Sequence, residues 1–73
     1  MTMYHTAQNH FFRDENDNRT HAVTSQLPDG SYEAELISTH DGELEKHALF
    51  GHGATRMEAI ANLQEQMDLE LNQ

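Results

Sequence analysis

Alternating apolar and polar side chains predict two consecutive β-strands in the first half of the chain. The segment 19–27 is rich in Thr, Val and Ser, and it ends at a Pro-Asp-Gly turn over residues 28–30. The segment 31–38 then alternates with the two-residue period of a half-buried strand, until Ile37 breaks the pattern. Its apolar side consists of Tyr32, Ala34 and Leu36, and its polar side of Glu33 and Glu35.

The segment 44–50 predicts a third strand, and the loop before it can close in two ways. A two-residue Asp41-Gly42 turn would mix apolar and polar side chains on the same face of the hairpin. A three-residue loop over 40–42, with Gly42 in the left-handed conformation of a G1 bulge, keeps the apolar side chains together. We therefore predict the bulged register, which pairs Leu36 with Lys46, Ala34 with Ala48, and Tyr32 with Phe50.

The strongest local signal is the sequence Thr-Arg-Met-Glu over residues 55–58, which fits a capping box. It predicts a helix that begins at residue 56. The Thr55 side chain would accept from the Glu58 amide, and the Glu58 carboxylate from the Thr55 amide. Apolar residues then recur at three- and four-residue spacing and form a stripe that would cover the sheet. The stripe consists of Ala59, Ile60, Leu63, Met67 and Leu71.

Together these segments predict an α+β domain, in which a three-stranded antiparallel meander packs against one C-terminal helix in the order βββα. The domain spans residues 19–73. Residues 1–18 form an N-terminal arm and a polar loop, and the arm is either disordered or a fourth, edge strand. Because Phe11 and Phe12 are too apolar to be left in water, part of the arm is expected to dock against the core, as an edge strand or as a turn. The predicted core consists of Tyr32, Leu36, Leu44, Phe50, Ile60, Leu63 and Met67.

The composition limits the function classes that the chain can serve. With 73 residues, 36% of them apolar, it forms one small domain with a modest core. It contains no cysteine, which excludes a disulfide framework and a thiolate zinc site. No segment approaches the length of an apolar membrane span, and the N-terminus lacks the features of a signal peptide. We therefore expect a cytoplasmic location.

The charge balance is strongly acidic, with 13 Asp and Glu against 4 Lys and Arg and a formal net charge of −9. Nucleic-acid-binding proteins gain affinity from Lys and Arg, so direct nucleic-acid binding is not expected. Six acids fall between residues 29 and 45 with no basic residue among them. They form either a solvated face that keeps the protein soluble or a surface that docks on a basic partner. These acids are Asp29, Glu33, Glu35, Asp41, Glu43 and Glu45.

No pattern in the sequence indicates catalysis, a metal site or a cofactor. The histidines and carboxylates that could gather, such as His47 with Glu35, match no compact metal-ligand spacing. The serines lack the motif of an activated nucleophile. The Gly-His-Gly run over residues 51–53 has no Lys and is too short for a phosphate loop, so it is interpreted as the turn into the helix. We predict a protein that is not an enzyme and holds no metal or cofactor.

Two stretches resemble motifs of the HicB-like antitoxin family. Gly-Ala-Thr-Arg-Met-Glu-Ala over residues 53–59 is similar to the family's Gly-x-Thr-x-x-Glu-Ala helix start, and Asp-Gly-Ser-Tyr-Glu-Ala over 29–34 to its opening Asp-Gly-Gly-Tyr-x-Ala. The resemblance covers residues 20–71 and implies a partial, catalytically inactive ribonuclease-H-like domain. The family's Pro-x-Leu-Pro-Gly-Cys segment is absent and no DNA-binding domain is predicted. The resemblance thus implies the toxin-neutralising part alone, with a small basic ribonuclease as its partner.

The sequence therefore predicts a small acidic protein-binding module. It would inhibit or regulate a basic partner, either a small ribonuclease or another nucleic-acid-binding protein. Two alternatives stay open: a phage-type acidic inhibitor that mimics nucleic acid, and a structural module that forms a homodimer through its sheet edge. The predicted partner contacts, all placed on the outer face of the sheet, are Glu33, Glu35, Glu45 and His47.

Overall fold

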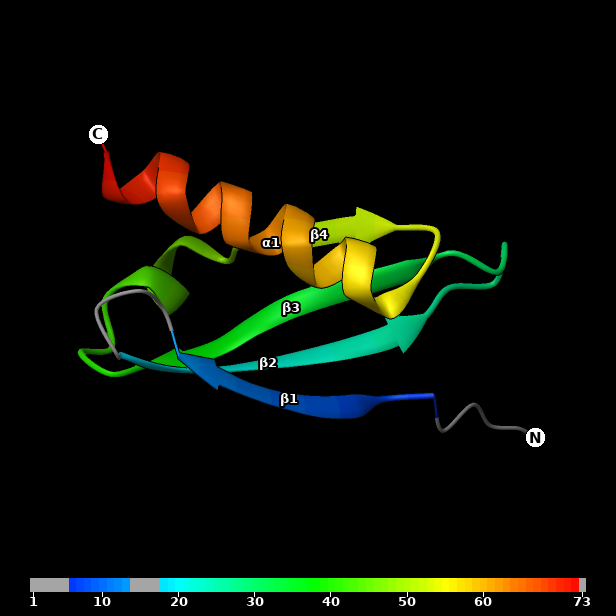
Figure 1. Cartoon of the computed structure of the whole chain (residues 1–73), viewed down its shortest axis with the longest axis horizontal. Helices are drawn as coiled ribbons and strands as arrows, with labels where there is room; N and C mark the ends of the chain where they lie inside the picture. Colours follow the sequence, from blue (N-terminus) through cyan, green and yellow to red (C-terminus); the bar gives the residue numbers. More distant parts are fainter. Residues whose placement is uncertain (1–5, 14–17, 73) are drawn as a thin grey trace.

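The computed structural model describes residues 6–13 and 18–72 and shows a sheet covered on one side by a helix (Figure 1). The strands are neighbours in chain order, and each pair is antiparallel. The predicted α+β class is confirmed, and the N-terminal arm supplies a fourth strand. Residues 1–5 and 14–17 of the predicted arm and loop lie outside the described residues. The elements are β1 (Gln8–Arg13), β2 (Arg19–Gln26), β3 (Tyr32–Thr39), the 3₁₀-helix η1 (Leu44–His47), β4 (Phe50–Gly53) and α1 (Arg56–Leu71).

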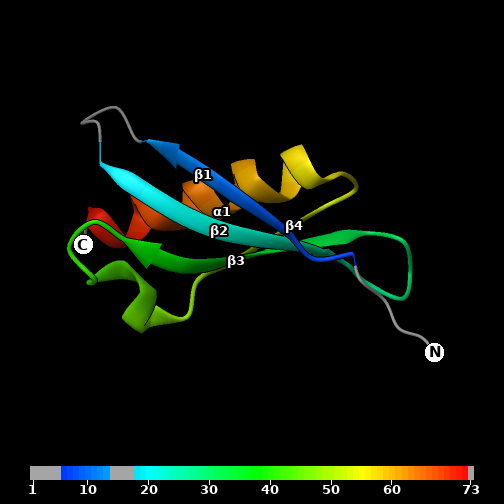
Figure 2. The ribbon, with the colours of Figure 1, turned by 90° about the horizontal axis from the view of Figure 1, so that it is seen from below.

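Helix α1 lies over β4 and β3 and reaches β2, and the core fills the space between these two layers. Seen from below, the opposite face of the sheet is covered by no other helix or strand of residues 6–13 and 18–72 (Figure 2). Leu63 is fully buried at the centre of the helix stripe. The core is small because three of its seven buried apolar side chains are alanines. These seven are Ala22, Ala34, Leu36, Leu49, Ala59, Leu63 and Met67.

Two glycines of β4 determine how closely α1 approaches the sheet. Gly51 is buried, and a Cβ atom there would overlap the backbone of Ala59 and Leu63. A Cβ at Gly53 would lie 2.6 Å from the Glu58 Cβ and 2.7 Å from the Ala59 nitrogen. The interpretation of residues 51–53 as a turn is therefore wrong: they form a strand, and their missing side chains make room for the helix.

The register predicted for the hairpin between residues 31–38 and 44–50 is also wrong. Gly42 does adopt a left-handed conformation, with φ of 72°, but the chain then forms η1 and β4 begins only at Phe50. The predicted register would put the Ala48 methyl opposite Ala34, beneath the helix, where α1 leaves no room for a side chain. A glycine fits there. The observed pairs are Tyr32 with Gly53, Glu33 with His52, Ala34 with Gly51, and Glu35 with Phe50.

The changed register redistributes the predicted core. Leu36, Leu63 and Met67 are buried as predicted, and Tyr32, Leu44 and Ile60 pack as half-buried side chains at its margin. Phe50 is not a core residue: it is 38% exposed, and Leu49 is buried in its place. Ile37, which breaks the sequence alternation, lies at a register shift between β2 and β3 and is 39% exposed. Such a bulge leaves one extra residue on one strand.

The N-terminus of α1 follows the predicted cap with one difference. The Thr55 hydroxyl oxygen accepts from the Glu58 amide at 3.1 Å, as predicted. The Glu58 carboxylate accepts from the Ala54 amide at 2.6 Å, one residue before the predicted donor. Both contacts satisfy backbone N–H groups around the first helical turn.

We expect Thr55→Ala to lower the free energy of unfolding by about 1 kcal/mol, because the Glu58 amide loses its acceptor. Urea denaturation monitored by circular dichroism measures this change. Thr55→Ser keeps the hydroxyl and should stay within about 0.5 kcal/mol of the wild type. Equal losses in both variants would contradict the capping role.

We expect Gly51→Ala to destabilise the protein by about 3 kcal/mol, because the new methyl group forces α1 away from β4. Gly42→Ala is the matched control, since its left-handed φ costs about 1 kcal/mol without a backbone overlap. The same denaturation experiment compares the two. A Gly51→Ala variant no less stable than Gly42→Ala would show that the helix does not rest on the β4 backbone.

Candidate protein-binding surface

The sheet face opposite α1, hereafter the open face, carries a mixture of aromatic, acidic and hydroxyl side chains. Alternate residues of each strand point to it, because successive side chains of a strand lie on opposite sides. Its aromatic and carboxylate groups are interleaved, because Phe50 lies directly opposite Glu35. The open face consists of Asn9, Phe11, Arg13, Arg19, His21, Val23, Ser25, Glu33, Glu35, Ser38, Phe50 and His52, so its β1–β2 end is basic and its β3 side is acidic.

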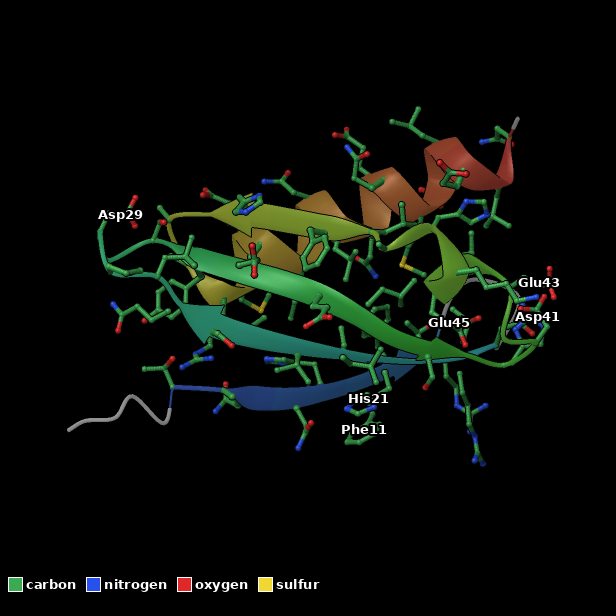
Figure 3. All side chains as sticks on the ribbon, turned by 180° about the vertical axis from the view of Figure 1, so that it is seen from behind. Phe11, His21, Asp29, Asp41, Glu43 and Glu45 are labelled. Carbon is green, nitrogen blue, oxygen red and sulfur yellow. The ribbon has the colours of Figure 1, made fainter. Side chains whose placement is uncertain are left out.

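Phe11 is the most exposed apolar side chain of the open face. It is 74% exposed, and its ring stacks on His21 with the centroids 4.4 Å apart and the planes at 15° (Figure 3). This stack holds the ring in one orientation but leaves most of it in water. Large exposed aromatic side chains are typical anchors of protein interfaces.

Glu33 and Glu35, two of the four predicted contacts, both lie on the open face. The Glu33 carboxylate is half-buried and pairs with the His52 imidazole at 3.1 Å. Glu35 is exposed, with Val23 and Phe50 as its neighbours on β2 and β4. These two carboxylates are therefore in one row along β3, accessible from the side that α1 does not cover.

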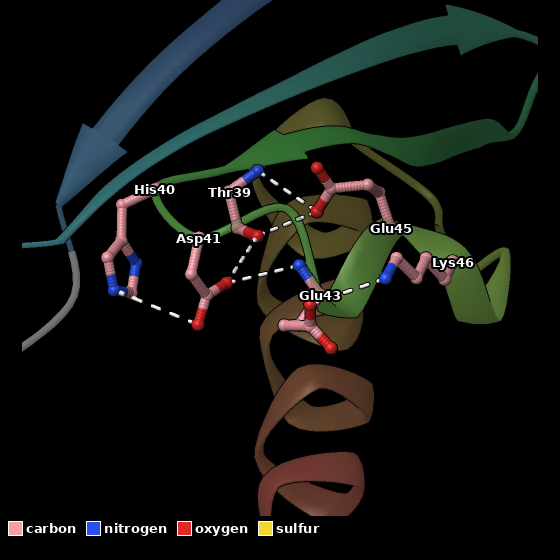
Figure 4. Close-up of polar contacts among 6 residues, drawn as sticks. All are labelled: Thr39, His40, Asp41, Glu43, Glu45 and Lys46. Atoms are coloured by element: carbon pink, nitrogen blue, oxygen red, sulfur yellow. Dashed lines mark hydrogen bonds and ion pairs between the residues drawn. The ribbon is translucent and has the colours of Figure 1, made fainter.

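The loop over residues 40–46, hereafter the acidic loop, is held by a network of side-chain to backbone hydrogen bonds (Figure 4). The Thr39 hydroxyl donates to the Glu45 carboxylate at 2.6 Å, and the Thr39 amide donates to the same oxygen at 3.2 Å. The Glu43 amide donates to the Asp41 carboxylate at 3.1 Å. At the surface, Lys46 pairs with Glu43 at 3.3 Å. Backbone and hydroxyl donors thus orient the carboxylates of Asp41 and Glu45, whereas that of Glu43 is held only by an exposed ion pair.

The same hydrogen bonds favour the charged form of two of these carboxylates. Donation by the Thr39 hydroxyl lowers the pKa of Glu45. Donation by the Glu43 amide lowers the pKa of Asp41. Figure 3 shows that Asp41, Glu43 and Glu45 gather at one end of the molecule, with Asp29 at the other end. Asp41 and Glu45 therefore keep their negative charge at neutral pH.

Glu45 and His47, the other two predicted contacts, do not lie on the open face beside Glu33 and Glu35. Both lie in η1 instead of on a strand. The Glu45 carboxylate is turned toward Thr39, and the His47 imidazole lies 3.6 Å from the Glu70 carboxylate of α1. The predicted neighbour relation between His47 and Glu35 is wrong, because Phe50 occupies the position opposite Glu35.

Sequence reasoning did not single out the features that the fold adds to this surface. It placed Asp41 in the turn before the predicted third strand and Glu43 in the charge run, but it did not predict that this turn gathers both carboxylates at one end of the molecule. It placed Phe50 in the core and left Phe11 docked against it. Only the observed register shows that both rings belong to the open face.

A separate polar network ties β1 and β2 to α1 on the covered side of the sheet. Thr24 is fully buried, and its hydroxyl oxygen accepts from Arg56 at 2.8 Å and lies 2.7 Å from the His10 Nε2. Arg56 also stacks over the Tyr32 ring, 4.9 Å from its centroid. A guanidinium only donates, so the hydroxyl proton remains for a neutral His10. Because Thr24 is sealed from solvent, these contacts help to hold β1 and β2 against the start of α1.

The described residues contain no group of three or more His, Cys, Asp or Glu side chains that could hold a metal ion. Within the same part of the chain, no helix is both long and apolar enough to cross a membrane. The surface offers Glu35 beside the exposed Phe50 ring on the open face, and a cluster of carboxylates in the acidic loop.

We expect the stability of the protein to fall as the pH drops below 6.5, partly through His10. Burial and the charge of Arg56 lower the pKa of His10 from 6.5, so the unfolded chain takes up a proton first. Between pH 7.5 and pH 5.5, the melting temperature of His10→Gln should fall by less than that of the wild type. Above pH 7.5, where His10 is neutral in both states, the difference between the two proteins should be constant. If the melting temperatures of the two proteins differed by the same amount at every pH, His10 would not contribute to the loss of stability.

Comparison of the chain with models of known protein families, with curated proteins and with solved structures finds no match. The resemblance of residues 20–71 to HicB-like antitoxins consequently rests on the short motifs alone. Function is best argued from the fold, the open face and the acidic loop.

Proposed function

We propose that this chain is a non-enzymatic protein-binding module that inhibits or regulates a basic, nucleic-acid-acting partner. One observation carries the proposal: Glu33 and Glu35 of β3 lie on the open face, and the carboxylates of the acidic loop gather at one end of the molecule (Figure 3). No Lys or Arg occurs from residue 20 to residue 45. A partner that binds phosphates with Lys and Arg would meet negative charges in a similar arrangement.

The rigidity of the acidic loop supports this function. A flexible carboxylate loses side-chain entropy when it binds, and that loss weakens the complex. Asp41 and Glu45 are already held by backbone and hydroxyl donors, so little of this loss remains to be incurred on binding. Their lowered pKa values also keep both groups ionised as the pH approaches their usual range.

The aromatic rings of the open face supply the apolar part of the interface. Phe50 is 38% exposed and lies beside Glu35 on the neighbouring strand. An apolar anchor surrounded by charges is the usual composition of a specific interface, in which the charges guide association and the anchor supplies affinity. The motif resemblance to HicB-like antitoxins favours a small basic ribonuclease as the partner.

The test is a pulldown with the full tagged chain from the lysate of its source cell, at low and at high salt, with bound proteins identified by mass spectrometry. We expect a basic nucleic-acid-acting protein that is released at high salt, because the contacts are charged. Capture of many unrelated DNA-binding proteins would instead favour a nucleic-acid mimic. Recovery of the chain alone would overturn the proposal.

A charge-matched pair of variants then tests the surface. We expect Glu33→Gln combined with Glu35→Gln to weaken binding of the captured partner by about tenfold, through a slower association rate. Glu65→Gln combined with Asp68→Asn removes the same charge from α1 and should change the affinity by less than about twofold. Calorimetry and stopped-flow mixing measure both quantities. Equal effects of the two pairs would show that net charge, and not β3, is recognised.

A further inference from the structure

The two edges of the sheet differ in how they are protected. At the β4 edge the strand has only four residues, two of them glycine, and the Asn62 side chain of α1 donates to the His52 carbonyl. Short edge strands and covering elements are the usual means by which proteins prevent edge-to-edge pairing. The β4 edge is thus shielded by the helix.

Within the described residues, the β1 edge shows none of these devices. Its six residues pair with β2 in an unbroken register, without a bulge or a proline. Alternate residues of an edge strand direct their N–H and C=O groups outward, where another strand can pair with them. The contacts of α1 are concentrated on β4, β3 and β2, so the helix does not shield this edge.

The charge distribution favours a second copy of this chain as the strand that pairs there. Two molecules of net charge −9 repel each other over most of their surfaces. Strands β1 and β2 contain none of the acidic residues and two of the four basic ones, Arg13 and Arg19. With Asp14, Glu15 and Asp17 of the connecting segment included, residues 8–26 carry a net charge of −1, against −8 for the rest of the chain. Two copies therefore repel each other less at the β1 edge than elsewhere.

We propose that β1 pairs antiparallel with β1 of a second copy, around a two-fold axis at Phe11, to form one continuous eight-stranded sheet. This inference goes beyond the proposed function and needs no other partner. A two-fold axis makes the contact self-complementary and closed, so that a dimer forms and not a fibre. Both helices then lie on the same side of the joined sheet, and both open faces on the other.

The side chains of β1 select this register. Pairing around Phe11 keeps the two faces of the sheet continuous, and it places Arg13 opposite the partner's Asn9, so that no like charges meet. Phe11 faces the partner's Phe11, and each ring keeps its stack on His21. Cross-strand aromatic pairs stabilise antiparallel sheets. A register centred on His10 would also preserve the faces, but it would leave Phe11 opposite an asparagine.

Sedimentation equilibrium over a range of concentrations tests the dimer. We expect the wild type to dimerise, and Phe11→Lys to raise the dissociation constant by at least about tenfold because two charges then face each other. Phe50→Lys puts the same charge on the open face at the far edge and should leave the dimer intact. A monomeric wild type, or a dimer that Phe11→Lys leaves unchanged, would overturn the proposal.

The absence of cysteine allows a second, independent test of the register. Under mild oxidation, we expect Phe11→Cys to form a disulfide-linked dimer, because the two side chains face each other across the axis. Val23→Cys, on the open face of β2, should stay monomeric on denaturing gels. Efficient linkage of His10→Cys without linkage of Phe11→Cys would overturn the register. Circular dichroism confirms that each variant folds, and the exposure of Phe11 leaves the core untouched.

Discussion

The close approach of α1 to the backbone of β4 is the constraint on which the rest of the molecule depends. With only three leucine or methionine side chains buried beside Leu49, the core gains stability through close contact more than through volume. Gly51 permits that contact. The helix fills the space that the side chains of a strand over residues 44–50 would need. The chain therefore forms η1 there, and the short strand β4 begins only at Phe50.

The consequences of this packing extend to the surface. A single helix centred on β4 and β3 leaves one face of the sheet and the β1 edge without a covering element. The η1 segment moves Glu45 and His47 off the sheet and gathers the loop carboxylates at one end. The carboxylates of β3 and of the acidic loop thus lie away from the strands β1 and β2, which contain Arg13 and Arg19 and no acidic residue.

The sequence was sufficient wherever a local signal determined the structure. The Pro-Asp-Gly turn and the alternation around Ala34 predicted β2 and β3, and Thr55 predicted the start of α1. Those two strands also placed Glu33 and Glu35 correctly on the outer side. The pattern failed after Gly42, because the alternation over residues 44–50 is compatible with a strand and nothing local reveals the space that α1 requires. The remaining site residues depended on that register.

Thr24 joins segments that share few other contacts. Its hydroxyl meets His10 of the edge strand and Arg56 of the first helical turn, so the buried Thr24 hydroxyl loses a partner if either residue withdraws. Such shared, buried hydrogen bonds make a structure open in larger cooperative units. The edge strand and the helix terminus therefore belong to one such unit, although they lie more than forty residues apart in sequence. Detachment of β1 would loosen the start of the helix that supports the whole sheet.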